Sequence, residues 1–219
     1  MLTLYGTRGS GSAAIDAALE LADQPCTRVD AASWVPGDGL DALGQINPLR
    51  QIPTLVLADG SVMTESAAIL IHLGLTLPES GLLPQDVALR AQAIRGLVFI
   101  VANCYAAISV IDFPQRWCAD ADEDSDVQLR IQRGTRHRLH LHWDMFATQF
   151  MPLAAGGQPF LNGAAPGALD LLASVVSRWS GSRQHLQVSQ PEFHALLLRV
   201  DTHPRLVAVF EHHWPTHGS

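Results

Sequence analysis

The spacing of apolar residues changes once along the 219-residue chain, and this change restricts the fold more than any other feature. Up to about residue 77, short runs rich in β-forming residues alternate with stretches of helical spacing. Beyond about residue 86, every periodic segment has helical spacing. The sequence therefore predicts an α/β domain over 1–77, a Pro- and Gly-containing linker over 78–86, and an all-α domain over 87–219.

The first domain is expected to follow the order β-α-β and then β-β-α. Strands are predicted at 2–5, 26–31, 54–57 and 61–64, and helices at 12–22 and 66–75. A helical crossover favours parallel pairing of the first two strands, whereas Ala58-Asp59-Gly60 predicts a hairpin between the last two. This order is that of a thioredoxin-like domain with a mixed four-stranded sheet, and the link at 34–44 reads as irregular.

The second domain is predicted to be entirely helical, without internal repeats. Helices are expected at 87–111, 126–150, 166–179, 191–200 and 204–213. In the first of them, apolar residues recur at helical spacing from Val87 to Ile108. The last three each have a proline near their start, which the first turn of a helix tolerates.

Composition narrows the function. The formal charge of −7 disfavours a nucleic-acid partner. All fourteen basic residues are Arg, which excludes the lysine chemistry of Schiff bases and of Walker-type loops. We find no apolar run of the length that spans a membrane and no signal-peptide pattern at the start. Three scattered cysteines without a CxxC pair fit a reducing compartment, and the histidines form no ligand set for a metal. A soluble cytoplasmic protein without a metal is therefore expected.

The segment Gln51-Ile52-Pro53 carries the first chemical signal. A proline that follows a loop and opens a strand cannot donate to the sheet, and we expect a cis peptide here. Such a turn presents the backbone of the preceding residue outward, where it can hold an extended peptide as an added strand.

Glu65-Ser66 carries the second signal, because this pair stands at the start of a predicted helix. Helix N-terminal N–H groups and the Ser66 hydroxyl favour a carboxylate, and Glu65 can accept from an ammonium group. Together with Gln51, Ile52 and Pro53, these residues indicate a site for a short peptide with both groups at one end.

With these motifs, the chain resembles the glutathione transferase superfamily, in particular bacterial members with a serine active site. The resemblance covers nearly the whole chain and rests on Asn47-Pro48, Gln51-Ile52-Pro53, Glu65 to Leu70 and Gly163 to Asp170. It implies glutathione as co-substrate, held at its cysteinyl backbone by Ile52 before a cis-proline and at its γ-glutamyl end by Glu65 and Ser66. It also implies a homodimer. A cation usually follows the second strand in the family to bind the glycyl carboxylate, but 32–49 contain none.

The loop before the first helix is the expected catalytic position. Thr7 and Ser10 stand where dithiol members of this fold carry cysteines, so dithiol chemistry is not expected. A hydroxyl here can donate to a bound thiolate and lower its pKa, which makes the glutathione thiol a better nucleophile. Ser10 is the predicted catalytic residue; Ser12 and Tyr5 are the alternatives. The competing interpretation is that the serine only caps the helix.

The electrophile is expected to bind on the first long helix of the second domain or just after it. Tyr105 and Trp117 are the predicted pocket residues, because each combines an apolar body with a hydrogen-bond donor. The leading function is transfer of glutathione to small apolar electrophiles. The alternatives are a glutathione-dependent disulfide reductase and a non-catalytic binding or regulatory protein of this fold.

Overall fold

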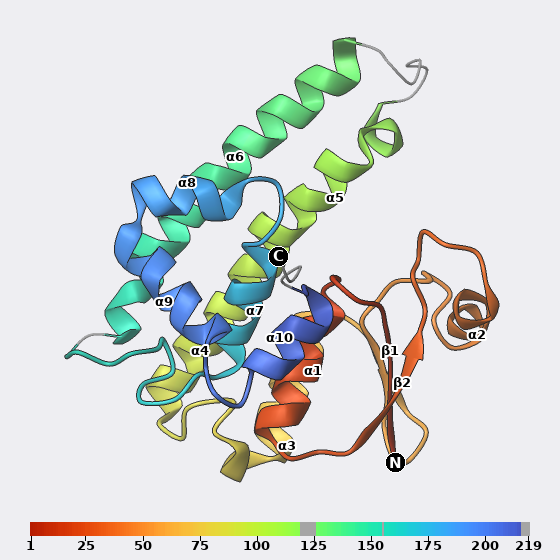
Figure 1. The fold of residues 1–219 in the computed structure, drawn as a ribbon, viewed down its shortest axis with the longest axis horizontal. Coiled ribbons are helices and arrows are strands. Elements are labelled where there is room, and N and C mark those ends of the chain that lie inside the picture. The colour runs from red at the N-terminus through yellow and green to blue at the C-terminus, as the bar shows by residue number, and fades with distance from the viewer. Residues whose placement is uncertain (119–125, 155, 216–219) are drawn as a thin grey trace.

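The computed structural model describes residues 1–118, 126–154 and 156–215. It confirms an N-terminal thioredoxin-like domain with a mixed sheet, followed by an all-helical region. In Figure 1, the sheet lies on one side of the molecule, and the first and third helices, α1 and α3, lie between it and the later helices.

The sheet has four strands in the order β2-β1-β3-β4. Their bounds are Leu2–Gly6 for β1, Cys26–Asp30 for β2, Thr54–Val56 for β3 and Val62–Met63 for β4. β1 is parallel to β2, with Leu2 opposite Cys26, and antiparallel to β3, with Leu4 opposite Leu55. The predicted hairpin joins β3 to β4 in antiparallel fashion.

Three helices belong to this domain: α1 (Ser12–Leu21), α2 (Asp38–Ile46) and α3 (Ser66–Thr76). α2 corrects the irregular link expected at 34–44. Its acidic residues Asp38 and Asp41 lie in the first turn, where carboxylates stabilise the helix dipole, and its Leu43 is fully buried. Its two glycines and two aspartates had suggested a loop.

The second domain contains the remaining helices. Their bounds are Val87–Phe99 for α4, Ala106–Asp112 for α5, Asp126–Phe150 for α6, Ala168–Val176 for α7, Ser182–Ser189 for α8, Pro191–Asp201 for α9 and Val207–His213 for α10. Short 3-10 helices lie at Pro78–Ser80, Pro114–Trp117 and Met151–Ala154. α8 was not predicted, because its sequence is mostly polar and only Ser182 and Leu186 are buried.

One long helical run corrects a prediction. Val87–Asp112 is continuous, and it is long and apolar enough by length and composition to cross a membrane, contrary to the sequence reading. In this fold it packs against α6 and α7 and buries Leu97, Ile100 and Ile111. The run is thus explained as a core helix of the second domain.

Helix α1 of the thioredoxin-like domain packs against helices of both domains. Nearly all its residues are buried, including Ile15 and Leu19, and it packs on α3, α7 and α10 (Figure 1). Because α1 is enclosed in this way, the loop that joins β1 to α1 is held at the junction of the domains.

Candidate active site

A cavity of about 580 Å³ lies between the two domains and is lined by residues of both. The thioredoxin-like domain contributes Gly9, Ser10, Gly11, Ser33, Trp34, Asn47, Gln51, Ile52, Pro53, Thr64, Glu65 and Ser66. The helical domain contributes Val101, Tyr105, Ala106, Ile108, Ser109, Asp112, Phe113, Arg116 and Trp179. One wall is therefore polar and built on loops and helix ends, and the facing wall is mostly apolar and aromatic.

The loop before β3 places Gln51, Ile52 and Pro53 on the polar wall. The Ile52–Pro53 peptide is cis. Buried Asn47 holds the loop together, because its amide Nδ2 donates to the Gln51 carbonyl at 3.1 Å and to the Thr54 hydroxyl at 3.0 Å. The Thr54 hydroxyl donates in turn to the same carbonyl at 2.8 Å. These bonds fix the backbone that precedes the cis-proline.

Glu65 and Ser66 lie beside this loop at the start of α3. Glu65 has a φ of 63°, a left-handed conformation that a non-glycine residue rarely adopts and that occurs in many functional sites. Ser66 is buried and is the first residue of the helix. Glu65 and Ser66 thus both line the cavity at the N-terminus of α3, a position where helix N–H groups favour an anion.

The loop between β1 and α1 brings two serines together. The Ser10 and Ser12 hydroxyl oxygens are 2.8 Å apart, and both lie within hydrogen-bond distance of the Thr7 carbonyl, at 2.7 and 3.2 Å. The Ser12 backbone N–H donates to Ser10 Oγ at 3.2 Å. Ser10 Oγ therefore accepts from the Ser12 backbone, and its single proton is donated to the Thr7 carbonyl, so donation to a bound thiol would replace that bond.

The three candidates for the catalytic hydroxyl differ in position. Ser10 lines the cavity, whereas Ser12 is 1% exposed and does not. Tyr5, on β1, is also absent from the lining. Of the three, Ser10 alone meets the cavity, with Ser12 as its hydrogen-bonded partner from behind.

Tyr105 enters the cavity from an irregularity in the long helix. Residues Ile100–Tyr105 form a π-helical turn between α4 and α5, and such turns are frequent at functional sites. His142 Nδ1 lies 2.9 Å from the Asn103 carbonyl within this turn. The Tyr105 ring stacks on Trp179, with centroids 5.6 Å apart. Burial raises the pKa of Tyr105 to about 12, and nearby Glu65 acts in the same direction.

Trp117 lies elsewhere. It is 62% exposed at the end of a 3-10 helix and is not among the lining residues. The indole on the helical-domain wall of the cavity is that of Trp179, which follows α7 and which sequence reasoning missed. Helical spacing could not reveal it, because residues 74 positions apart are brought together only by the packing of α7 against the long helix.

The link after β2 supplies no cation in the described structure, in agreement with the sequence. Its residues Ser33 and Trp34 line the cavity. Among the lining residues the cation is Arg116, whose guanidinium lies 4.0 Å from the centroid of the Phe113 ring. Within the described residues, no group of three His, Cys, Asp or Glu is arranged to hold a metal ion.

Comparisons with known proteins show which proteins the chain is similar to. Residues 18–75 match the model of the glutathione S-transferase N-terminal domain. A glutathione transferase from Methylococcus capsulatus is 27% identical, with a TM-score of 0.72 over 96% of this chain and 98% of that one. The chain is therefore similar to glutathione S-transferases, through the family model over residues 18–75 and through the fold over nearly its whole length.

Two further relatives place the chain among its neighbours. An uncharacterized glutathione-transferase-like protein of Escherichia coli, YncG, is 38% identical over 124 residues, which is 56% of this chain and 60% of the relative. A glutathione transferase homologue from Sulfitobacter, whose crystal structure contains bound glutathione, is 24% identical with a TM-score of 0.77 over 95% of this chain and 96% of that one. The Sulfitobacter structure thus has the same overall fold as this chain.

Proposed function

We propose that this protein is a glutathione transferase that binds glutathione on the polar wall of the cavity and that Ser10 activates the glutathione thiol for attack on small apolar electrophiles. The observation that carries the proposal is the convergence of Ser10, the Ile52–Pro53 turn and the Glu65-Ser66 helix start on one wall of one cavity.

Each part of glutathione has a partner of the right chemistry in this proposal. The Ile52 backbone beside the cis-proline pairs with the cysteinyl backbone, with Gln51 next to it. Ser66 and the N-terminus of α3 bind the γ-glutamyl carboxylate, and Glu65 accepts from the ammonium group. Between them the thiol points toward Ser10, whose hydroxyl donates to the sulfur and favours the thiolate.

The facing wall suits an apolar second substrate. Val101, Tyr105, Ile108, Phe113 and Trp179 supply apolar and aromatic surface opposite the thiol position. Apolar walls with a few polar groups are typical of small-molecule sites. Tyr105 adds a hydroxyl donor, and a donor of this kind stabilises charge that develops on an electrophile during attack.

We also propose that two copies form a homodimer, in a reducing cytoplasm that supplies glutathione. Large apolar side chains are exposed on α3, α4 and α6: Leu75, Val87, Leu89, Val98 and Met145. α4 packs on both α3 and α6, so these side chains belong to neighbouring elements. Exposed apolar surface over adjacent elements is typical of protein interfaces.

The alternative of a non-catalytic binding protein has one supporting observation, the lack of a cation in 32–49. The alternative of a disulfide reductase rests on the same cavity, with bound glutathione supplying the thiols.

Three measurements separate these functions. Calorimetry should show glutathione binding at millimolar concentration or below, and no binding would remove both enzymatic functions. Conjugation to a chloronitroaromatic electrophile should then exceed thiol–disulfide exchange with a small disulfide. Exchange without conjugation would favour the reductase, and binding without either reaction would favour the regulatory protein. Sedimentation of the native chain and of Val98→Asp tests the dimer, since a charge in an apolar interface should shift the population to monomer.

A further inference from the structure

The loop that carries Ser10 is fastened to the end of α10, about 200 residues later in the chain. Arg8 Nε donates to the His212 carbonyl at 2.8 Å, and the Gly9 backbone N–H donates to His213 Nδ1 at 3.2 Å. Gly9 has a φ of 70°, and a Cβ on it would lie 3.5 Å from Trp214 Nε1. The loop conformation therefore depends on what α10 presents to it.

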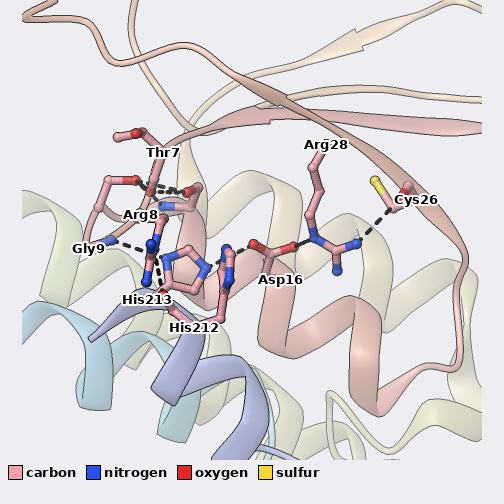
Figure 2. A network of polar contacts seen from close by, with 10 residues as sticks. Thr7, Arg8, Gly9, Asp16, Cys26, Arg28, His212 and His213 are labelled. Carbon is pink, nitrogen blue, oxygen red and sulfur yellow. Dashed lines mark hydrogen bonds and ion pairs between the residues drawn. The ribbon is translucent and has the colours of Figure 1, made fainter. Parts of the chain in front are cut away.

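The other ring nitrogen of His213 also makes a hydrogen bond. Its Nε2 lies 2.9 Å from Asp16 Oδ2 on α1, and both side chains are buried. The second oxygen of Asp16 accepts from Arg28 Nε on β2 at 2.6 Å. Figure 2 shows these groups as one row from the Ser10 loop through His213 and Asp16 to Arg28.

This row defines which imidazole nitrogen carries the proton. A backbone N–H can only donate, so Nδ1 of His213 must be the acceptor. Nε2 then carries the proton and donates to Asp16, an arrangement in which one hydrogen bond sets the role of the other nitrogen. Arg28 holds the Asp16 carboxylate so that an oxygen faces the ring.

Among the residues that the structure describes, few other charged groups surround the His213 imidazole ring. Asp16 faces it from α1, with Arg28 behind on β2, and Arg8 lies on the loop. His212 is its neighbour on α10, with ring centroids 5.4 Å apart. Arg178, after α7, lies 4.3 Å from the Trp214 ring, next along the chain. A proton added at Nδ1 would face the Gly9 N–H directly, and the two donors would repel.

We propose that His213 is a positioning residue for the Ser10 hydroxyl: in the Nε2-protonated tautomer set by Asp16, it holds Gly9 and so aims the adjacent serine into the cavity. This inference rests on the proposed function, because the consequence of the aim is activation of the glutathione thiol. The loop contact itself is a separate claim.

Asp16→Asn tests the tautomer without removing His213. The Arg28 guanidinium can only donate, so the new amide should turn its oxygen to Arg28 and its NH₂ group to His213 Nε2. The imidazole proton should then move to Nδ1 and break the bond to Gly9. Long-range ¹H–¹⁵N spectra of the imidazoles should show the Nε2–H form in the native chain and the Nδ1–H form in Asp16→Asn, without glutathione. An unchanged tautomer would overturn the inference.

His213→Asn and His213→Gln separate positioning from packing. The Asn side-chain oxygen stands near the Nδ1 position and can accept from Gly9, whereas the longer Gln side chain reaches toward Asp16 but leaves the Nδ1 position empty. We expect His213→Gln to lower kcat/KM for conjugation about tenfold, the factor that one weakened hydrogen bond produces. His213→Asn should recover most of that loss even if it unfolds at a lower temperature. His212→Gln is the matched control, because its exposed ring is on the same helix.

Different results would overturn the inference about His213 and the proposed function. Activities that follow thermal stability in all variants, with His213→Asn no better than His213→Gln, would show that His213 only packs and would overturn the inference. A native chain that neither binds glutathione nor conjugates it would overturn the proposed function. In that case, the Gly9 amide shift in His213→Gln relative to His213→Asn still decides whether the loop contact exists.

Discussion

The Tyr105 hydroxyl lies against the backbone of Gly11, so close that a Cβ built on Gly11 would meet the oxygen at 2.0 Å. A backbone hydrogen bond of Gly11 to this oxygen acts to lower the pKa of Tyr105, although burial outweighs it. The helical domain thus directly contacts the loop that carries Ser10 in the thioredoxin-like domain, one residue after this serine. The absence of a side chain at position 11 is a condition for this approach.

Burial of Tyr105 predicts a specific loss of stability at alkaline pH. Its pKa is raised from 10 to about 12, so the folded chain keeps a proton that the unfolded chain releases. Stability contributed by the neutral hydroxyl is complete below pH 10 and is lost as pH rises toward 12. The free energy of unfolding should fall by up to about 2 kcal/mol more in the native chain than in Tyr105→Phe over this range. Urea denaturation of both proteins between pH 10 and 12 measures this difference. The same decrease in the free energy of unfolding with pH in both proteins would contradict this assignment.

Gly11→Ala should be destabilising because of Tyr105 in particular. A Cβ at position 11 forces the phenol away from the loop, at a cost of about 1–3 kcal/mol for overpacking. In Gly11→Ala/Tyr105→Leu, the shorter side chain removes the clash, so the double variant should lose less stability than the two single variants added together. A double-mutant cycle from chemical denaturation measures this coupling. Strict additivity would mean that the contact does not constrain the fold.

Asp170 should be a major stabilising residue of the helical domain. Its fully buried carboxylate accepts from the backbone N–H groups of Leu161, Asn162 and Gly167 at 2.7, 3.2 and 3.0 Å. Asp170→Ala leaves these donors without their acceptor, and we expect a loss of about 3–5 kcal/mol. Asp170→Asn keeps one acceptor oxygen and should lose less. Thermal unfolding of the three proteins checks this order, and an unchanged midpoint in Asp170→Ala would refute it.

The parts of the site that sequence reasoning found are those built from neighbouring residues. Ile52-Pro53 and Glu65-Ser66 each depend on local turn and helix-start chemistry, so their motifs are readable in a few letters. Trp179, Arg116 and His213 were missed as site residues because only tertiary packing brings them to the loop and the cavity. Trp117 was predicted because it follows the long helix and combines an apolar body with a donor, but the helix ends at Asp112 and leaves Trp117 on the surface.

The same difference between local sequence signals and tertiary packing explains which helices were predicted. α6 was predicted at its observed bounds, because its apolar residues repeat over 25 residues and Asp126 starts it. α2 was missed because glycine and aspartate are frequent in loops, and only burial of Leu43 against the domain explains why this segment is helical.

The central claim is that Ser10, rather than Ser12, lowers the pKa of the glutathione thiol. The most direct test is an ultraviolet titration of thiolate absorbance for glutathione bound to the native chain, to Ser10→Ala and to Ser12→Ala. We predict a bound thiol pKa in the native protein below that of free glutathione. It should return to about the free value, ordinarily near 8.5 for a cysteine thiol, in Ser10→Ala. A smaller change is expected in Ser12→Ala, whose hydroxyl supports Ser10 from behind. A depressed thiol pKa that persists in Ser10→Ala and is lost in Ser12→Ala would contradict the account.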